Sequence, residues 1–307
     1  MWRRRMYKVV QQQQHAVVML CCGGLTLAYC MLGLSVPVTE EEHSTSHSYQ
    51  TKGNSCRVPP LHDADEFFAL LETPQVVCKN LQLVGGGYYG WRDGGEGGKL
   101  ACMDPGLTIG GEKCLVLSFG IGADWTFDDA MDDIGCKVYS MDPTLFLPDH
   151  NRTDNIQFLD LGVGKERGYQ NITINKQVVK AKVDTYQGIL HRLGILNSTI
   201  DYMKLDIEGA ELDFLDDAIT RWPHLLHNIK QIGIEIHTSK LKGKSKKSAW
   251  QKILKFWTYF HQLQCEKFQL VWSVANDVSS NLYQLNGQQR SGCYEILLIN
   301  QRFLSGS

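Results

Sequence analysis

The segment "CLVLSFGIGADWTFDDAM", residues 114–131, begins with an unbroken apolar run that is typical of a strand buried on both faces. Gly120 and Gly122 follow at once, and glycine allows the backbone to turn sharply. The residues from 124 to 135 then predict a helix that ends on glycine. This order of strand, glycine turn and helix is typical of the first unit of a doubly wound α/β sheet.

The pattern continues on the C-terminal side, where apolar strand-like runs alternate with helical periodicity. Such alternation predicts a mostly parallel sheet over residues 113–307. The last two strands have no helix between them, which predicts an antiparallel hairpin at one edge. We predict strands at 114–119, 137–142, 155–164, 202–207, 229–237, 268–275 and 294–299, a β-rich excursion at 171–183, and helices at 124–135, 185–193, 210–219 and 249–263.

Residues 56–112 form an N-terminal extension with a different composition. A short helix is predicted at 63–72, before Pro74. The stretch 83–98 contains eight glycines and resembles a phosphate loop, but it lacks the G-K-[ST] ending and has no clear helix after it. We therefore interpret it as an irregular loop.

The N-terminus predicts a membrane anchor, because residues 16–36 carry no charge and about 20 apolar residues suffice to cross a bilayer. The basic tail 1–15 precedes this run, and the acidic start of a polar stem, 37–55, follows it. The positive-inside rule then places the tail in the cytosol and the body outside it. A cleaved signal peptide is the alternative, although its apolar region would be shorter.

Three sequons, at Asn151, Asn171 and Asn197, agree with an exported body. Together with the anchor they predict a single-pass type II protein of the Golgi or another secretory membrane. The formal net charge of −2 argues against a general nucleic-acid binder, which needs a cationic surface.

The seven cysteines beyond the anchor include no C-x-x-C pair, so a zinc ribbon is not expected. Cys56, Cys78 and Cys102 lie in loop-like sequence and are the better disulfide candidates. A second group of three cysteines adjoins or lies in predicted strands, and we expect these residues to be core thiols. An odd total leaves at least one thiol unpaired. The strand group is Cys114, Cys136 and Cys293.

The glycine turn predicts a ligand site, because ligands of open α/β sheets bind at the carboxyl ends of the strands. Asp142 ends the second strand, where a carboxylate can bind a ribose diol. Trp125 stands where a dinucleotide fingerprint requires its third glycine, and an indole there would hinder the seating of a pyrophosphate. The ligand is therefore expected to be a nucleoside without a diphosphate, such as S-adenosylmethionine.

Acidic residues gather where the fourth and fifth strands end. Asp206 lies at the end of the fourth strand, with Glu208 two residues on, and Glu235 and His237 end the fifth. Asp206, Glu208 and His237 are therefore candidates for acceptor deprotonation. His237 is a potential base near neutral pH. As an alternative, these three residues hold a divalent cation. Glu211 is interpreted as a residue of the helix's first turn or as a buried partner of a cation.

The segments around these residues resemble the methyltransferase-like protein 24 group, which is related to FkbM-type methyltransferases. The resemblance rests on "CLVLSFGIGADWTFDDAM", "GCKVYSMDPT", "YMKLDIEGAEL" and "IGIEIH". It implies a class I, Rossmann-like methyltransferase fold that uses S-adenosylmethionine. The predicted cofactor-binding residues are Phe119, Gly120, Gly122, Asp142, Asp160 and Asp206, and the predicted catalytic residues are Asp206, Glu208 and His237.

The function that these features favour is O-methylation of a glycan, or of another hydroxyl acceptor such as one on a protein, in the secretory pathway. A type II glycosyltransferase is an alternative, because Asp206-Ile207-Glu208 is one residue away from the D-x-D motif that holds a metal and a sugar nucleotide. A non-catalytic domain of the same fold is a second alternative. The five lysines in 240–248 are read as a solvated loop, or as a contact for an anionic acceptor.

Overall fold

The structure is a computed structural model, and it describes residues 56–86, 97–122, 124–174, 177–276 and 282–304. The predicted anchor and stem lie outside these residues. In the described ranges no helix has the length and apolarity needed to span a membrane. The body forms one compact unit, Asn54–Ser307.

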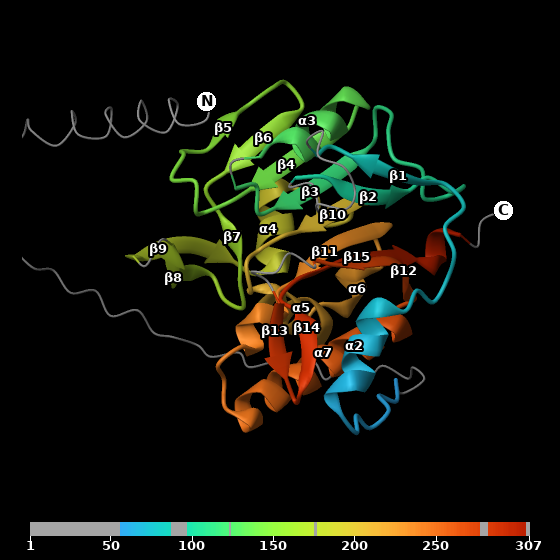
Figure 1. The fold of residues 1–307 in the computed structure, drawn as a ribbon. Helices are drawn as coiled ribbons and strands as arrows, with labels where there is room; N and C mark the ends of the chain where they lie inside the picture. Colours follow the sequence, from blue (N-terminus) through green and yellow to red (C-terminus); the bar gives the residue numbers. More distant parts are fainter. Residues whose placement is uncertain (1–55, 87–96, 123, 175–176, 277–281, 305–307) are drawn as a thin grey trace, which may run out of the picture. The chain divides into compact units, whose positions relative to one another are not determined.

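An eight-stranded sheet runs through this unit in the order β12-β15-β11-β10-β3-β4-β6-β5 (Figure 1). The five strands from β11 to β6 are parallel, which confirms the predicted sheet. β15 pairs antiparallel with β12 and also with β11, and β5 is antiparallel to β6. The strands are β3 (Leu115–Phe119), β4 (Lys137–Met141), β5 (His150–Asn151), β6 (Ile156–Leu159), β10 (Tyr202–Leu205), β11 (Gln231–Ile236), β12 (Phe268–Ala275) and β15 (Tyr294–Asn300).

The strand order reverses at β3, because the chain first builds β4 and β6 on one side and then returns to place β10 on the other. The carboxyl ends of β3 and β10 therefore flank the switch point, where open α/β sheets bind ligands. The β-rich excursion forms a separate three-stranded sheet. It consists of β7 (Gly162–Val163), β8 (Gly168–Ile174) and β9 (Gln177–Asp184).

Two apolar layers cover the two faces of the main sheet, and each layer forms its own hydrophobic core with the sheet. Successive side chains of β3 point to opposite faces, so Leu117 belongs to one core and Val116 to the other. One layer is helical, and the other consists of α3 with the N-terminal hairpin (Figure 1). The helical layer contains α2 (Ala64–Glu72), α4 (Tyr186–Leu193), α5 (Glu211–Thr220), α6 (Pro223–Leu226) and α7 (Lys246–Cys265). The opposite layer contains α3 (Thr126–Asp133), β1 (Leu81–Val84) and β2 (Lys99–Cys102).

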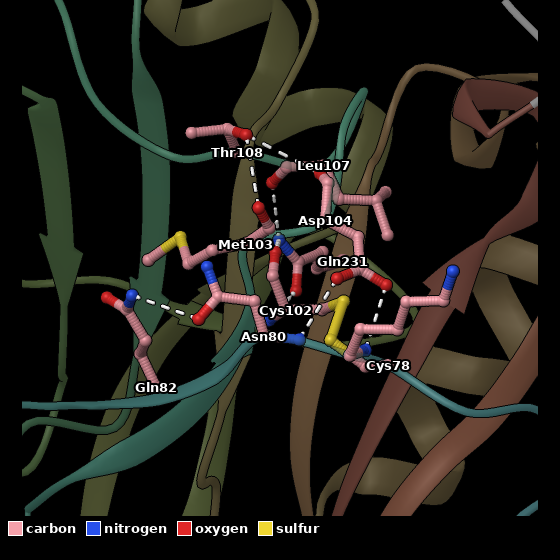
Figure 2. The surroundings of a disulfide bond; sticks show 10 residues. Cys78, Asn80, Gln82, Cys102, Met103, Asp104, Leu107, Thr108 and Gln231 are labelled. Carbon is pink, nitrogen blue, oxygen red and sulfur yellow. Dashed lines mark hydrogen bonds between the residues drawn. A yellow bond between two sulfur atoms is a disulfide. The ribbon is translucent and has the colours of Figure 1, made fainter. Parts of the chain in front are cut away.

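The hairpin of β1 and β2 corrects the expectation that residues 83–98 are an irregular loop, since the stretch begins inside β1 and ends next to β2. Residues 87–96 lie outside the described residues. Buried Gln231 of β11 fixes the hairpin, because its side chain accepts a hydrogen bond from the Cys102 amide and donates to the Cys102 carbonyl (Figure 2). The hairpin is therefore part of the domain's core.

Three disulfides join Cys56 to Cys265, Cys78 to Cys102, and Cys114 to Cys136. The last pair corrects the expectation of core thiols. Each of its cysteines directly precedes one of two neighbouring strands, and the register Leu115↔Lys137 brings them side by side. Cys293 is the free, buried thiol of the described part.

The remaining short elements complete the C-terminal region. A hairpin of β13 (Leu282–Leu285) and β14 (Gln288–Ser291) lies between β12 and β15 in the chain. The 3-10 turns η2 (Thr238–Leu241) and η4 (Gln301–Phe303) follow β11 and β15.

Candidate functional site

The glycine loop after β3 rests directly on the residue that follows β10. Gly120 has a φ of 78°, and a Cβ at this position would lie 1.7 Å from the Asp206 carbonyl oxygen. Only glycine fits this contact. Gly122 has a φ of 57°, but a Cβ there would meet nothing within 4 Å, so this part of the loop faces open space.

Asp142 lies under the same loop and is 3% exposed. Its Oδ2 accepts hydrogen bonds from the amides of Ile121 at 2.9 Å and Gly122 at 2.8 Å. Its Oδ1 accepts from the amide of Thr144 at 2.7 Å and from its hydroxyl at 2.6 Å. The carboxylate therefore shapes the glycine loop. Its predicted contact with a ribose stays a prediction.

Lys204 supports the loop from β10, because its buried Nζ donates to the Gly120 carbonyl. Burial lowers the pKa of this lysine, against the opposing charge of Asp206. Sequence reasoning passed over Lys204 because it stands inside an apolar strand run without a recognisable motif.

Phe119 and Asp160 lie at the same edge of the sheet. The Phe119 side chain belongs to the core, while its carbonyl accepts from the Asp206 amide at 3.0 Å. Asp160 follows β6 and is partly exposed. Burial, followed by the charge of Asp149, raises the pKa of its carboxyl. Both remain predicted cofactor contacts.

Trp125 packs beside the loop at the start of α3. Its ring meets Phe158 of β6 at a centroid distance of 5.7 Å, and the Arg152 guanidinium lies 4.6 Å from the ring centroid. The indole therefore packs between the start of α3 and β6, at the sequence position where a dinucleotide fingerprint has its third glycine.

A cluster of charged groups occupies the other side of the switch point. Asp206 follows β10, Glu235 lies on β11, and Glu295 lies on β15 in register with Glu235. A ligand atom from each of the three carboxylates lies within 4.8 Å of the others. Lys99 of β2, which is 4% exposed, lies among them. Its Nζ is 3.3 Å from Asp206 Oδ2 and also donates to Glu295 Oε1.

Burial and these contacts shift the pKa values of the groups in the cluster in different directions. Burial alone would lower the pKa of Lys99, but the charges of Glu295 and Asp206 raise it well above its usual value. Burial would raise the pKa of Asp206, but Lys99 and a hydrogen bond with Glu235 lower it below its usual range. Burial, together with Asp206, raises the pKa of Glu235 to about 8. The Asp206 and Glu235 carboxyls therefore interact directly, and their pKa values move in opposite directions.

His237, at the end of β11, is 8% exposed and has carboxylates on both ring nitrogens. Its Nδ1 lies 2.6 Å from Glu211 Oε1, and its Nε2 lies 3.5 Å from Glu208 Oε2. Burial would lower the pKa of the imidazole, but these acids and Glu235 raise it to about 9. These acids therefore favour the protonated ring, whereas the sequence suggested a base near neutral pH.

Glu211 is the buried partner that sequence reasoning offered as one of its two interpretations. It is 1% exposed, and its Oε1 also accepts from the Gly209 amide at 2.9 Å. Glu208 differs, because its side chain is 80% exposed and its backbone has a φ of 53°. The structure thus brings Asp206, Glu208 and His237 together, as predicted from neighbouring strand ends.

The sequence did not indicate Lys99 or Glu295 as residues of this edge, and it indicated Cys293 only as a core thiol. Cys293 donates from its thiol to Glu235, and burial raises the pKa of that thiol. Glu295 interrupts the apolar run "YEILLI", and an acid inside a buried strand is a signal that could have been used. Nothing in the sequence around Lys99 indicates its position.

The fold and this edge define a Rossmann-like α/β domain with a glycine loop at its switch point. Residues 41–285 match the model of a family described as a methyltransferase domain, and the chain therefore belongs to this methyltransferase family. No curated protein matches the chain. A solved chain described as "Putative hemolysin from Streptococcus thermophilus" is 12% identical, with a TM-score of 0.33, over 66% of this chain and 71% of that one.

Proposed function

We propose that the protein transfers a methyl group from S-adenosylmethionine to an acceptor at the carboxyl edge of β3 and β10. The observation that carries the proposal is the contact between Gly120 and Asp206. It joins the glycine loop, where a cofactor binds in open α/β sheets, to the cluster of charged residues on the neighbouring strands. Membership of the methyltransferase family supports the reaction class.

The residues at the loop fit this cofactor. The open space at Gly122 leaves room for a ligand against the backbone, and Asp160 offers a partly exposed carboxylate at the end of β6. Asp142 fixes the loop amides, so the loop is shaped before a ligand arrives. The bound cofactor would supply the electrophilic methyl group, and the protein would supply orientation.

The acceptor side favours a hydroxyl group. The main chain of Asp206 touches Gly120 of the glycine loop, and Lys99 holds one of its carboxylate oxygens. A hydroxyl that binds to the other oxygen would be oriented by a hydrogen bond to an ionised carboxylate. O-methylation is therefore the reaction that we propose.

An anionic glycan is the acceptor class that the surroundings support. Five lysines of η2, the loop after it and the start of α7 are exposed, and they form no ion pair among the described residues. The Lys240 chain lies across Gly209, next to Glu208, so this basic surface adjoins the cluster. Sulfate or carboxylate groups would bind the lysines while a sugar hydroxyl approaches Asp206. The lysines are Lys240, Lys242, Lys244, Lys246 and Lys247.

We also propose a secretory location, in a single-pass type II membrane protein of the Golgi or a related compartment. Three disulfides support it, because such bonds persist in oxidising compartments. The asparagines of the three sequons are exposed, which glycosylation requires. The location requires that S-adenosylmethionine, which is made in the cytosol, is imported.

The test is a transfer assay with methyl-labelled S-adenosylmethionine and the full chain purified from a secretory expression host. Sulfated and uronic-acid oligosaccharides, their neutral counterparts and acidic peptides serve as acceptors. We expect label on the acidic oligosaccharides, with release of S-adenosylhomocysteine. Transfer of sugar from a sugar nucleotide, with no methyl transfer, would instead support the glycosyltransferase alternative and overturn the proposal.

A further inference from the structure

We propose that Asp206, Glu208 and His237 form a binding site for a divalent cation at the acceptor edge. The site would take a first-row ion such as Mn²⁺, held by two carboxylate oxygens and one imidazole nitrogen. The inference adds a metal to the proposed methyl transfer. It depends on that function only for the ion's catalytic role, because the binding itself can be measured separately.

The three donors converge from neighbouring strands. Asp206 and Glu208 stand two residues apart in the turn after β10, and His237 ends the adjacent β11. One ligand atom from each of the three lies within 4.8 Å of the other two. A modest inward movement would place all three around one ion at about 2.0–2.2 Å, the usual range for imidazole and carboxylate ligands.

The orientation of His237 is the independent observation that points to a ligand. Buried Glu211 holds Nδ1 at 2.6 Å and is itself fixed by the Gly209 amide. The ring is thereby turned so that Nε2 faces Glu208 Oε2 at 3.5 Å and Glu235 Oε1 at 4.0 Å. Among the described residues, no hydrogen bond reaches Nε2. A carboxylate fixed on one nitrogen is the usual outer support of a metal-binding histidine. A cation bound at Nε2 would replace the proton of that nitrogen, and the Glu208 carboxylate beside it would become a second ligand.

The distribution of charge fits a cation beside Glu208. Lys99 compensates the cluster on the side of Glu295 and Asp206, where its Nζ bonds both carboxylates. The opposite side has the carboxylates of Glu208 and Glu211 beside the single imidazole of His237. A divalent ion at the three donors would offset this excess of carboxylates.

The donor set also indicates the kind of site. Two carboxylates suit Mn²⁺ and Mg²⁺, while the imidazole favours a transition metal, so Mn²⁺ satisfies both. Three protein ligands leave positions open for water or substrate, as in catalytic rather than structural sites. The 80% exposure of the Glu208 side chain places that open side toward solvent. An acceptor hydroxyl bound there would lose its proton more readily.

The experiment titrates Mn²⁺ into the full chain after removal of metals with a chelator, followed by calorimetry and by the electron paramagnetic resonance signal of free Mn²⁺. We expect one saturable site. Glu208→Gln, a change at an exposed side chain, should weaken binding at least ten-fold. Glu211→Gln should weaken it about 10–100-fold, as for other residues that orient a metal-binding histidine.

Two control variants make the result specific. Glu66→Gln removes an exposed carboxylate that lies 2.9 Å from His62, so it matches the carboxylate–imidazole chemistry away from the site, and Mn²⁺ affinity should not change. Cys293→Ser tests the competing donors Glu235, His237 and Cys293. Loss of binding in Cys293→Ser with binding retained in Glu208→Gln would overturn the proposal, as would no binding at millimolar Mn²⁺.

A parallel titration with S-adenosylmethionine separates the two proposals. Cofactor binding without Mn²⁺ binding would remove the metal site and leave the methyltransferase intact. Mn²⁺ binding without cofactor binding would remove the proposed function and leave the metal site.

Discussion

The two sides of the switch point are held in place by different interactions. On the side of β4, Asp142 satisfies two loop amides, and Gly120 packs against the Asp206 carbonyl while Lys204 binds the Gly120 carbonyl. On the side of β11, buried ionisable groups stabilise one another, with Lys99 between Asp206 and Glu295. The first side is shaped by backbone geometry, and the second by electrostatics.

Because of this difference, the two sides should respond to different kinds of substitution. A backbone-shaped loop responds to volume and to lost main-chain hydrogen bonds, whereas a charged cluster responds to the loss of one partner and to pH. Substitutions on the two sides should therefore differ in the size and kind of their effect.

The largest effect is expected from Lys99→Met on the charged side. Removing a buried cation leaves two carboxylates without their partner, which should lower the free energy of unfolding by about 3–5 kcal/mol. Lys165→Met is the matched control, because Lys165 also bridges two acids, Asp213 and Asp216, but is 39% exposed. It should cost about 0–1 kcal/mol. Equal losses in urea unfolding would contradict the account of the charged side.

Gly120→Ala should have the next largest effect, on the backbone-shaped side. Gly111→Ala is its control, since Gly111 has a φ of 89° and a Cβ there would meet nothing within 4 Å. Both variants carry the strain of a positive φ, about 1–2 kcal/mol. Only Gly120→Ala adds a clash with the Asp206 backbone. Its free energy of unfolding should therefore be about 1–3 kcal/mol lower than that of Gly111→Ala. Identical unfolding midpoints would show that the loop is not seated on Asp206.

Asp142→Asn should lower stability by about 1–2 kcal/mol, because two loop amides lose a charged acceptor. Asp104→Asn is a close match, because Asp104 also accepts from two amides, those of Lys79 and Asn80, at 3.0 Å each, but beside the open end of the N-terminal hairpin (Figure 2). We expect similar stability losses, with S-adenosylmethionine affinity reduced about ten-fold only in Asp142→Asn. Equal cofactor affinities in the two variants would show that Asp142 has no special part in the ligand site.

The smallest effect is a pH dependence that Glu235→Gln should remove. The pKa of Glu235 is raised from 4.5 to about 8, so the stability due to its bound proton is complete below about pH 4.5 and is lost as the pH rises toward 8. Between pH 6 and pH 7 the wild type should therefore lose about 1 kcal/mol relative to Glu235→Gln. Urea midpoints measured with a chelator present provide the comparison. Parallel curves would place the Glu235 pKa near its ordinary value.

Much of the sheet could be predicted from the sequence, because its central strands are continuous apolar runs. β12 has the predicted limits, and β3 and β4 each differ by one residue at an end. β1 and β2 were missed because they are short and lie beside glycines, so neither length nor periodicity marks them. Their pairing depends on tertiary contacts such as that of Gln231 with Cys102.

The candidate site, too, could be predicted from the sequence only in part. The proximity of Asp206 and His237 follows from the ends of neighbouring parallel strands, which sequence order and fold class supply. The contribution of Lys99 does not follow, because a hairpin far away in sequence carries it to the cluster. The protonation states of Glu235 and His237 arise from burial and from that geometry, and only a structure provides them.

The most direct test of the central claim is a calorimetric titration of the full chain with S-adenosylmethionine, repeated with S-adenosylhomocysteine. The account predicts saturable binding of one molecule of either ligand per chain, weakened in Asp142→Asn and retained in Asp104→Asn. Folded protein that binds neither ligand, or that binds only a nucleotide sugar, would contradict it.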